Sequence, residues 1–329
     1  MEISNDHLSV ELVTFGAELQ SIRTRDGMEW LWQGDPAFWS GRSPLLFPTI
    51  GKSPGHRVRI DGVAYPMMPH GFAMRSEFQI VAQEKNLVTL VLESSERTLA
   101  NFPFVFHLIV SYALKQGSIE CIATVVNLDC RPMPFQFGFH PGIAWPLPGS
   151  HGRLHEVVLG NGGEPPLYRL DDEMLLSDRP VASPFRAGRL TPSPVHFEDD
   201  AMLFLSGAGE SVSFSAQGGA RVEMHTVNLP HLALWQEPGA GFLCLEPWHG
   251  TEPFARMGDD LETRNGSVSL LPGERTSFQM NLTFVSALTP GRAPGGGVER
   301  WLGSSEQPSS IAKWSVCRFH AAARSGWLK

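Results

Sequence analysis

Apolar and polar side chains alternate strictly along Phe278-Gln279-Met280-Asn281-Leu282-Thr283-Phe284. A period of two residues puts successive side chains on opposite faces of a β-strand, so this stretch predicts a strand with one face in a core and the other in water. The dipeptide Pro272-Gly273 just before it is a turn signal. The stretch therefore predicts antiparallel β-structure that is buried on one side.

Short strand-like runs recur along the chain, and no long stretch keeps a helical period. The dipeptide Asp61-Gly62, between residues 57–60 and 63–65, has the composition of a two-residue hairpin turn. With 33 Gly and 26 Pro to supply turns, the sequence predicts an all-β fold, a large antiparallel β-sandwich. Further strands are expected at residues 8–15, 87–93, 105–114, 119–127 and 221–227.

Length and charge restrict the classes of partner. The chain has 329 residues, of which 42% are hydrophobic, enough for a packed core. Its net charge of −8 gives no general attraction to nucleic acid or to an anionic membrane surface. No basic segment followed by an apolar run occurs at the N-terminus, and no apolar stretch is long enough to span a bilayer. We therefore expect a cytoplasmic protein without nucleic-acid or membrane partners.

Neither a disulfide framework nor a metal site is indicated. The cysteines form no C-x-x-C pair, which favours buried, inert thiols: Cys121, Cys130, Cys244 and Cys317. Four histidines are candidates for a metal site, but no H-x-H or H-x-x-x-H spacing joins them: His70, His140, His225 and His249. No metal and no cofactor are predicted.

Composition changes near the C-terminus. Residues 291–329 carry six basic and two acidic side chains, so this part has a charge of +4 and the rest −12. It opens with the linker-like run Pro290-Gly291-Arg292-Ala293-Pro294-Gly295-Gly296-Gly297. We expect one domain over residues 1–288 and a weakly ordered basic tail over residues 289–329, which either docks on the acidic domain through its aromatic residues or is an accidental extension.

Three segments each place one ionisable side chain among glycine, proline and aromatic residues: Pro69-His70-Gly71-Phe72-Ala73, Phe137-Gly138-Phe139-His140-Pro141-Gly142 and Leu245-Glu246-Pro247-Trp248-His249-Gly250. A carboxylate and two imidazoles can move protons near neutral pH. Aromatic faces accept the apolar face of a hexose. Together the segments predict a sugar site.

Structural roles are the alternative for each of these residues. Either histidine could close its turn by bonding a backbone carbonyl, and Glu246 could pair with an arginine such as Arg256. Glu246 nevertheless follows the apolar run 242–245, where a carboxylate is costly unless it is paired or used. That placement favours a functional role.

With these segments in view, the chain resembles the aldose 1-epimerase (galactose mutarotase) superfamily over about residues 3–284, and within it the mutarotase-like branch found beside bacterial sugar operons. The most specific likeness is Glu29-Trp30-Leu31-Trp32-Gln33-Gly34-Asp35-Pro36 through Trp39, followed by Pro44-Leu45-Leu46-Phe47-Pro48-Thr49-Ile50-Gly51. The three site segments then follow in the family's order. The resemblance implies a galactose-mutarotase-type β-sandwich with an open cleft for the sugar on one sheet.

The resemblance also implies roles for single residues. Glu246 matches the family's catalytic base, His140 its acid and His70 a second active-site histidine. Glu246 would take the proton of the anomeric hydroxyl while His140 protonates the ring oxygen, so that the ring opens; His70 would bond the ring oxygen. Rotation about the bond beside the aldehyde and reclosure give the other anomer.

Substrate-binding roles are expected for five further residues: Asp200, Lys52, Arg75, Trp248 and Trp32. Asp200 is the match for a family aspartate that binds sugar hydroxyls, with Asp199 one residue away. Lys52 stands where the family commonly has an arginine, and a lysine offers a point charge in place of a planar fork. Arg75 would supply that fork.

We expect a cofactor-independent isomerase that acts on a small sugar, as a monomer or homodimer. Two other functions stay open. One is a non-catalytic carbohydrate-binding or sensing protein that uses Trp32, Trp39 and Trp248 as stacking faces. The other is a hexose-6-phosphate 1-epimerase, for which Lys52, Arg57 and Arg75 are the candidate phosphate ligands.

Overall fold

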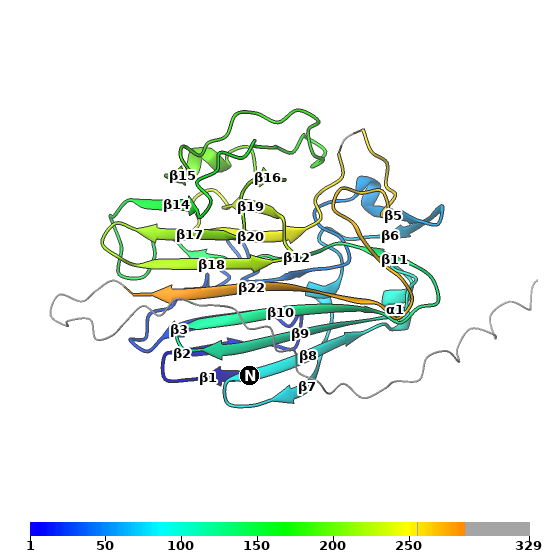
Figure 1. The fold of residues 1–329 in the computed structure, drawn as a ribbon, viewed down its shortest axis with the longest axis horizontal. Helices are drawn as coiled ribbons and strands as arrows, with labels where there is room; N and C mark the ends of the chain where they lie inside the picture. Colours follow the sequence, from blue (N-terminus) through cyan, green and yellow to red (C-terminus); the bar gives the residue numbers. More distant parts are fainter. Residues whose placement is uncertain (255, 287–329) are drawn as a thin grey trace, which may run out of the picture. The chain divides into compact units, whose positions relative to one another are not determined.

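The computed structural model describes residues 1–254 and 256–286. Nearly all of the regular structure in these residues is β (Figure 1). In chain order the strands are β1 Glu2–Ser4, β2 Leu8–Leu12, β3 Leu19–Thr24, β4 Leu45–Leu46, β5 Arg57–Ile60, β6 Val63–Pro66, β7 Gln79–Gln83, β8 Leu87–Glu93, β9 Phe106–Lys115, β10 Ser118–Asn127, β11 Met133–Phe135, β12 Phe137–Phe139, β13 Gly142–Ala144, β14 His155–Leu159, β15 Arg189–Leu190, β16 Met202–Phe204, β17 Ser211–Ala216, β18 Arg221–Val227, β19 His231–Trp235, β20 Phe242–His249, β21 Val268–Leu270 and β22 Arg275–Val285.

In the described part of the chain, helices are few and short. One α-helix, α1 (Glu96–Leu99), and three 3-10 turns, η1 (Pro54–His56), η2 (Ala73–Arg75) and η3 (Pro194–Phe197), lie between strands. Within residues 1–254 and 256–286, no helix is long and apolar enough to cross a membrane.

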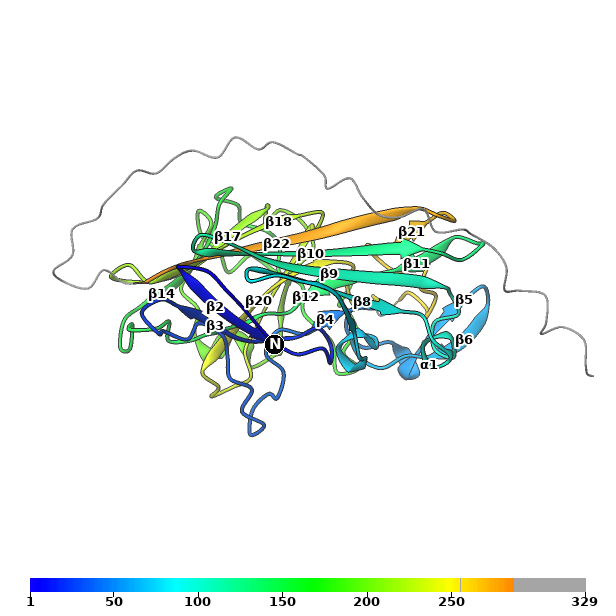
Figure 2. The same cartoon turned by 90° about the horizontal axis from the view of Figure 1, so that it is seen from below.

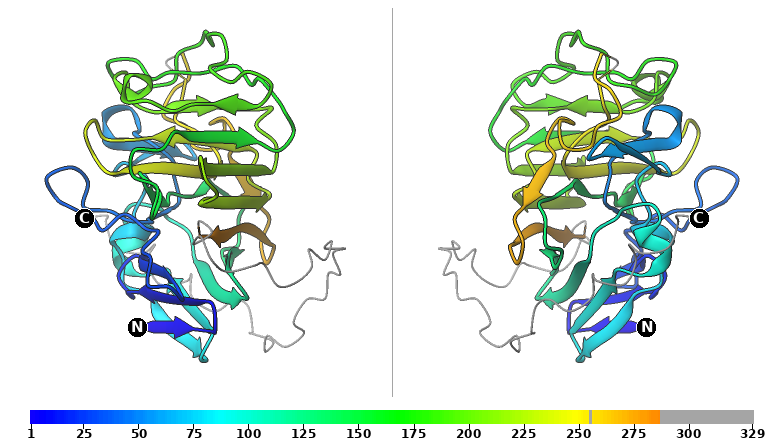
Figure 3. Two further views of the ribbon diagram at one scale, coloured as in Figure 1. Left: turned by 90° about the vertical axis from the view of Figure 1, so that its left-hand side faces the viewer. Right: turned by 90° about the vertical axis from the view of Figure 1, so that its right-hand side faces the viewer.

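Two large antiparallel sheets make up the body of the fold. The first has nine strands in the order β15-β14-β17-β18-β22-β10-β9-β8-β7. The second has six, with β16-β19-β20-β12-β4 in order and β13 paired to β20. The two sheets lie as separate layers, with β12 and β4 on one side of the layer of β22, β10 and β9 (Figure 2). Figure 3 shows the cyan strands β7 and β8 at one end of this body and the green strands around β14 at the other. The predicted antiparallel β-sandwich is confirmed.

A single large core fills the space between the sheets. It receives Leu282 from β22, Leu108 from β9 and Leu245 from β20, all fully buried. Contact across the layers is direct, because the ring of Phe137 in β12 stacks on that of Phe278 in β22 with centroids 5.0 Å apart. Burial of this apolar surface is the main favourable term in folding. One face of the six-stranded sheet is thereby committed to the core, and its other face is free to carry a site.

The strand predicted over residues 278–284 is part of β22. Phe278, Met280, Leu282 and Phe284 are buried, whereas the residues between them are partly exposed. The predicted hairpin is also present: β5 and β6 are joined by Asp61 and Gly62, both with positive φ. The strands predicted at residues 87–93 and 221–227 coincide with β8 and β18.

One predicted strand is shorter than expected. The strand predicted over residues 8–15 ends at Leu12. The chain turns directly afterwards, where the N–H of Ala17 donates to the carbonyl of Thr14 at 3.2 Å. Ala17 and Gly16 both have positive φ, which an extended strand does not allow.

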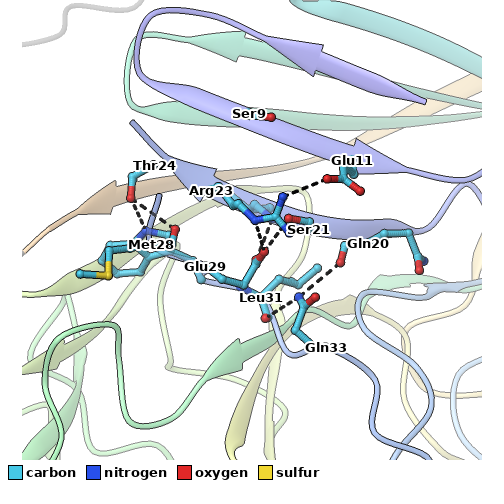
Figure 4. Close-up of polar contacts among 12 residues, drawn as sticks. Ser9, Glu11, Gln20, Ser21, Arg23, Thr24, Met28, Glu29, Leu31 and Gln33 are labelled. Atoms are coloured by element: carbon cyan, nitrogen blue, oxygen red, sulfur yellow. Dashed lines mark hydrogen bonds and ion pairs between the residues drawn. The ribbon is translucent and has the colours of Figure 1, made fainter. Parts of the chain in front are cut away.

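Glu29 anchors the segment of residues 29–39 to the small sheet β1-β2-β3 (Figure 4). Its Oε1 accepts hydrogen bonds from the backbone N–H groups of Ile22 at 2.9 Å and Leu31 at 3.0 Å. Its Oε2 accepts from the hydroxyl of Ser21 and lies 3.3 Å from Nε of Arg23. One carboxylate therefore ties the start of this segment to β3.

The prediction of buried cysteines has a mixed outcome. Cys121 and Cys244 are buried as expected, but Cys130 is exposed, because it follows the end of β10 where the chain turns at the surface. The tail over residues 289–329, Cys317 included, lies outside the described residues.

Replacement of Leu282 by alanine is expected to lower the free energy of unfolding by about 2–5 kcal/mol, because it leaves a cavity in the core between the sheets. The matched control is Asn281→Ala on the other face of β22, expected to change it by about 0.5 kcal/mol. Urea unfolding of both variants provides the measurement. Equal losses would contradict the assignment of the two faces.

Candidate active site

Strand β20 supplies both a core face and a site face. Its side chains alternate, so Leu243 and Leu245 enter the main core, whereas Cys244, Glu246 and Trp248 point away from it. The strand is buried along almost its whole length and pairs with β19 through Ala233 opposite Glu246. Glu246 is therefore held in the middle of a sheet by its neighbours on both sides.

A cavity of about 510 Å³ lies against this second face. It brings together residues that are far apart in the sequence, from the loop after β4, the loop before η2, the end of β12, the loop after η3, and β20. All but one of the site residues predicted from sequence line it: Lys52, His70, Arg75, His140, Asp200, Glu246 and Trp248.

His140 and Glu246 face each other in the cavity. Nε2 of His140 lies 3.1 Å from Oε2 of Glu246, and the two residues are 7% and 1% exposed. The arginine considered as an alternative partner is elsewhere, because Nε of Arg256 lies 3.4 Å from Oδ1 of Asp178. The buried carboxylate is thus opposed by an imidazole and not by a permanent cation.

Burial favours the neutral form of each member of this pair. It raises the pKa of Glu246 well above the ordinary value, and the carboxylates of Glu252 and Asp200 raise it further. It lowers the pKa of His140 well below the ordinary value, with a smaller contribution from His70. The favoured state of the pair is therefore a protonated Glu246 carboxyl group facing a neutral imidazole, with Oε2 and Nε2 3.1 Å apart.

A strained loop presents His70. Its φ is +61°, a left-handed conformation that few non-glycine residues adopt, and the following Gly71 has φ +73°. A Cβ on Gly71 would lie 2.2 Å from the carbonyl oxygen of Phe47, so only glycine fits there. Arg75 closes the loop, because its Nη1 donates to the carbonyls of Pro69 and Gly71, both at 3.1 Å.

The hydrogen bonds of His70 define its tautomer. Nδ1 accepts from the backbone N–H of Gly51 at 3.2 Å. Burial, with a further contribution from the charge of Arg75, lowers the pKa of His70 to about 4. At neutral pH the ring is therefore uncharged and carries its proton on Nε2, which makes His70 a hydrogen-bond donor toward the cavity.

Aromatic rings surround the pair. Trp39 stacks on His140 with ring centroids 4.9 Å apart, and Trp235 meets the same imidazole edge-on at 5.9 Å. Trp32 does not line the cavity; its Nε1 instead donates to the carbonyl of Trp39 at 2.8 Å and so supports the stacking ring. The sequence-based assignment of Trp32 to sugar binding thus corresponds here to a supporting position.

Trp248 lines the cavity as well. Gly138 of β12 is its strand partner, and a Cβ on that glycine would come within 2.5 Å of the indole Cδ1. The glycine in Phe137-Gly138-Phe139 is therefore explained by the ring that covers it. The segment 30–32 joins the same layer, since the N–H of Trp32 donates to the carbonyl of Gly142 at 2.8 Å.

Of the two neighbouring aspartates, the structure places Asp200 in the cavity lining and Asp199 outside it. Asp200 has φ +64°, and its Oδ1 accepts from the N–H of Ala201 at 2.7 Å. Lys52 also lines the cavity. Arg57 does not reach the cavity, because it pairs with Asp259 at 3.3 Å.

The lining residues that sequence reasoning missed include Trp235 and Glu252. Trp235 ends β19 and comes to the site only through the pairing of β19 with β20. Glu252 lies two residues beyond the Leu245–Gly250 segment, next to Pro253, and nothing in the local pattern predicts that it is 4% exposed.

The four histidines considered for a metal site do not converge. His225 and His249 each bond a backbone carbonyl, those of Glu210 and Asn228. One group within the described residues does have ligand spacing, His140, Cys244 and Glu246, whose donor atoms lie within 4.8 Å of one another. Burial and Glu246 raise the pKa of Cys244 well above its usual value, which keeps it a thiol and makes this donor set a poor fit for a metal.

The chain is similar in sequence to a known family and to relatives, some of which have solved structures. The aldose 1-epimerase family matches residues 1–283. The protein LacX of Lactococcus lactis subsp. lactis is 28% identical over 300 residues, which cover 87% of this chain and 99% of LacX.

Solved structures show the same fold. A galactose mutarotase related enzyme from Lactobacillus acidophilus is 26% identical with a TM-score of 0.81, covering 87% of this chain and 97% of that one. A galactose mutarotase-like protein from Lactobacillus casei is 26% identical with a TM-score of 0.79, covering 86% and 99%. With the family match spanning nearly all of the described residues, the chain belongs to the aldose 1-epimerase family.

Proposed function

We propose that the protein is an aldose 1-epimerase that interconverts the α and β anomers of a free hexose. The observation that carries this proposal is the contact of 3.1 Å between His140 and Glu246 inside the cavity. In a cyclic sugar the anomeric and ring oxygens are bonded to the same carbon. A base for one oxygen and an acid for the other must therefore lie close together, as these two groups do.

The reaction needs one proton on the pair and returns it. Transfer of the proton of the neutral pair from Glu246 to His140 first gives a carboxylate and an imidazolium. Glu246 then takes the proton of the anomeric hydroxyl, the bond from C1 to the ring oxygen breaks, and His140 protonates that oxygen. The open aldehyde then rotates about the C1–C2 bond. Reclosure reverses both transfers and leaves the pair as it began. His70, with its proton on Nε2, donates a hydrogen bond to the ring oxygen and keeps it in place during rotation.

The charges around the cavity favour a free sugar over a phosphorylated one. Five carboxyl side chains line it: Glu198, Asp200, Glu237, Glu246 and Glu252. Among the described lining residues, Lys52 and Arg75 are the permanent cations, and Nη1 of Arg75 is already committed to the carbonyls of the His70 loop. A phosphate would meet more negative than positive groups.

A non-catalytic sugar-binding protein is the second candidate, and the observation that favours it is Lys52 at the position where the family commonly has an arginine. Lysine provides no bidentate fork. Binding of a hexose without acceleration of its mutarotation would establish this second function.

Glu246→Gln is expected to reduce the acceleration of α-D-glucose or α-D-galactose mutarotation by about 100-fold or more, because the amide keeps the shape of the side chain but cannot accept the proton. His140→Ala is expected to reduce the acceleration of mutarotation by a similar factor. Polarimetry of freshly dissolved sugar measures both. Glu198→Gln, at the exposed edge of the same cavity, is the matched control, expected to stay within about twofold of the parent protein. Full activity in Glu246→Gln would refute its role as the base.

Hexose 6-phosphates are expected to be poor substrates compared with the free hexoses, since the carboxyl groups of the cavity repel the phosphate. The comparison is made by polarimetry on glucose and glucose 6-phosphate at equal concentration. Preference for the phosphorylated sugar would show that Lys52 and Arg75 dominate recognition.

His70 is expected to remain neutral as the pH is lowered and to gain its proton only near pH 4, because burial and Arg75 oppose the charged form. Two-bond proton–nitrogen NMR correlation is expected to show a neutral ring protonated on Nε2 at neutral pH. The resonance is assigned by its loss in His70→Gln. A titration midpoint near the ordinary value of 6.5, or a proton on Nδ1, would contradict the donor role.

A further inference from the structure

Glu252 is a buried acid that the proposed reaction does not use. It lines the same cavity as Glu246 and is 4% exposed. Its Oε2 is buried without a hydrogen-bond partner among the described residues. A carboxyl oxygen in such a place costs free energy unless a donor reaches it.

The backbone is shaped to admit this side chain. A Cβ on Gly51 would lie 2.2 Å from Cγ of Glu252, so the carboxyl group occupies the space that any other residue at position 51 would fill. Gly51 cannot satisfy the carboxyl group with its N–H, because that N–H donates to Nδ1 of His70. Glu252 and His70 are thus positioned by the same residue.

A buried cation lies near Glu252 without forming a close ion pair with it. Arg264 is 3% exposed, and its Nη2 donates to the hydroxyl of Ser53 at 3.0 Å. Within the described part of the chain, no nitrogen of Arg264 comes within 4.0 Å of the Glu252 carboxylate. Burial raises the pKa of Glu252 to about 7, with a smaller contribution from Asp200, while the backbone of Glu252 itself and the charge of Arg264 oppose the rise. Arg264 thus offsets part of the burial cost but leaves the lone pairs of Oε2 without a donor.

We propose that Glu252 is a substrate-binding residue that accepts a hydrogen bond from a ring hydroxyl of the sugar other than the anomeric one. Glu246 and Glu252 line one cavity and interact electrostatically, so a pyranose whose anomeric hydroxyl meets Glu246 can present a further hydroxyl to Glu252. Because Gly51 contacts both Glu252 and His70, this second hydroxyl fixes the sugar relative to the group that holds the ring oxygen. Glu252 would then set which hydroxyl configurations bind. This inference rests on the proposed function only in that the ligand is a sugar.

Binding of deoxy sugars tests the proposal. Isothermal titration calorimetry of the parent protein and of Glu252→Gln is carried out with D-glucose, D-galactose and their 2-, 3-, 4- and 6-deoxy forms. For one carbon, removal of the hydroxyl is expected to weaken binding to the parent protein by about 10-fold, because a hydrogen bond to the carboxyl group is lost. In Glu252→Gln the loss of affinity caused by the same removal is expected to be several-fold smaller. Removal of a hydroxyl at any other carbon is expected to lower the affinity by the same factor in both proteins.

A merely structural role gives a different pattern. If Glu252 only supported the structure, Glu252→Gln would lower the affinity for every sugar by the same factor. Removal of each hydroxyl would then lower the affinity equally in both proteins, and that result would overturn the proposal. Glu198→Gln serves as the control for loss of one negative charge at the edge of the cavity. If Glu252→Gln does not fold because Arg264 is left without its counter-charge, the double variant Glu252→Gln/Arg264→Met removes both charges and is measured in its place.

The outcomes separate this inference from the proposed function. Sugar binding with the expected coupling but without acceleration of mutarotation would support Glu252 and refute the epimerase. Acceleration of mutarotation, with each hydroxyl removal lowering the affinity equally in the parent protein and in Glu252→Gln, would support the epimerase and refute the binding role of Glu252. Absence of binding by every sugar in the panel would overturn both.

Discussion

The structure depends on the burial of one carboxyl group, that of Glu246, in the middle of a sheet. A carboxylate in an apolar strand is unfavourable unless its surroundings supply compensation. Here the imidazole of His140 lies 3.1 Å from the carboxyl group, and burial favours the neutral form of both groups over a permanent ion pair. Removing the imidazole would leave the carboxyl group alone, so the strand, the loop that carries His140 and the chemistry are coupled energetically.

The elements around this pair act through contacts that are individually ordinary. Glu29 fixes the start of the segment that carries Trp32, Trp32 supports Trp39, and Trp39 stacks on His140. On the other side, Arg75 closes the loop of His70, and Gly51 orients its ring. Each contact constrains the next, which leaves His140 and His70, two of the groups proposed to take part in the reaction, little freedom to reorganise. Such preorganisation is what stabilises charge that develops during a reaction.

Much of the fold was predictable, because alternation along a strand is a local property. The pattern at residues 278–284 gave the buried and exposed faces of β22, and the Asp61-Gly62 dipeptide gave the hairpin. The end of β2 at Leu12 was missed because it depends on a turn, and the exposure of Cys130 because it depends on where a loop meets the surface.

The candidate site was predictable where its residues carry a local signature or resemble a family motif. His70, His140 and Glu246 stand among glycines and prolines, and all three reach one cavity. Glu252 has no such signature, because its burial arises from close packing against Gly51, about 200 residues earlier in the chain. Trp32 shows the opposite difficulty, because a local signal is present without the expected place in the cavity lining. An indole suits stacking on a sugar, but Trp32 donates a hydrogen bond to Trp39 and supports that ring without lining the cavity.

The alternation of β20 has a further consequence for how this protein can change. Leu245 and Glu246 are neighbours on one backbone, yet one belongs to the core and the other to the cavity. A substitution that repacks the core at Leu245 also shifts the peptide that carries Glu246. Substitutions that adapt the protein to a new temperature and those that adapt it to a new substrate therefore affect the same backbone segment. Stability and activity are therefore not independent traits in this strand, and gains in one are expected to require adjustment of the other.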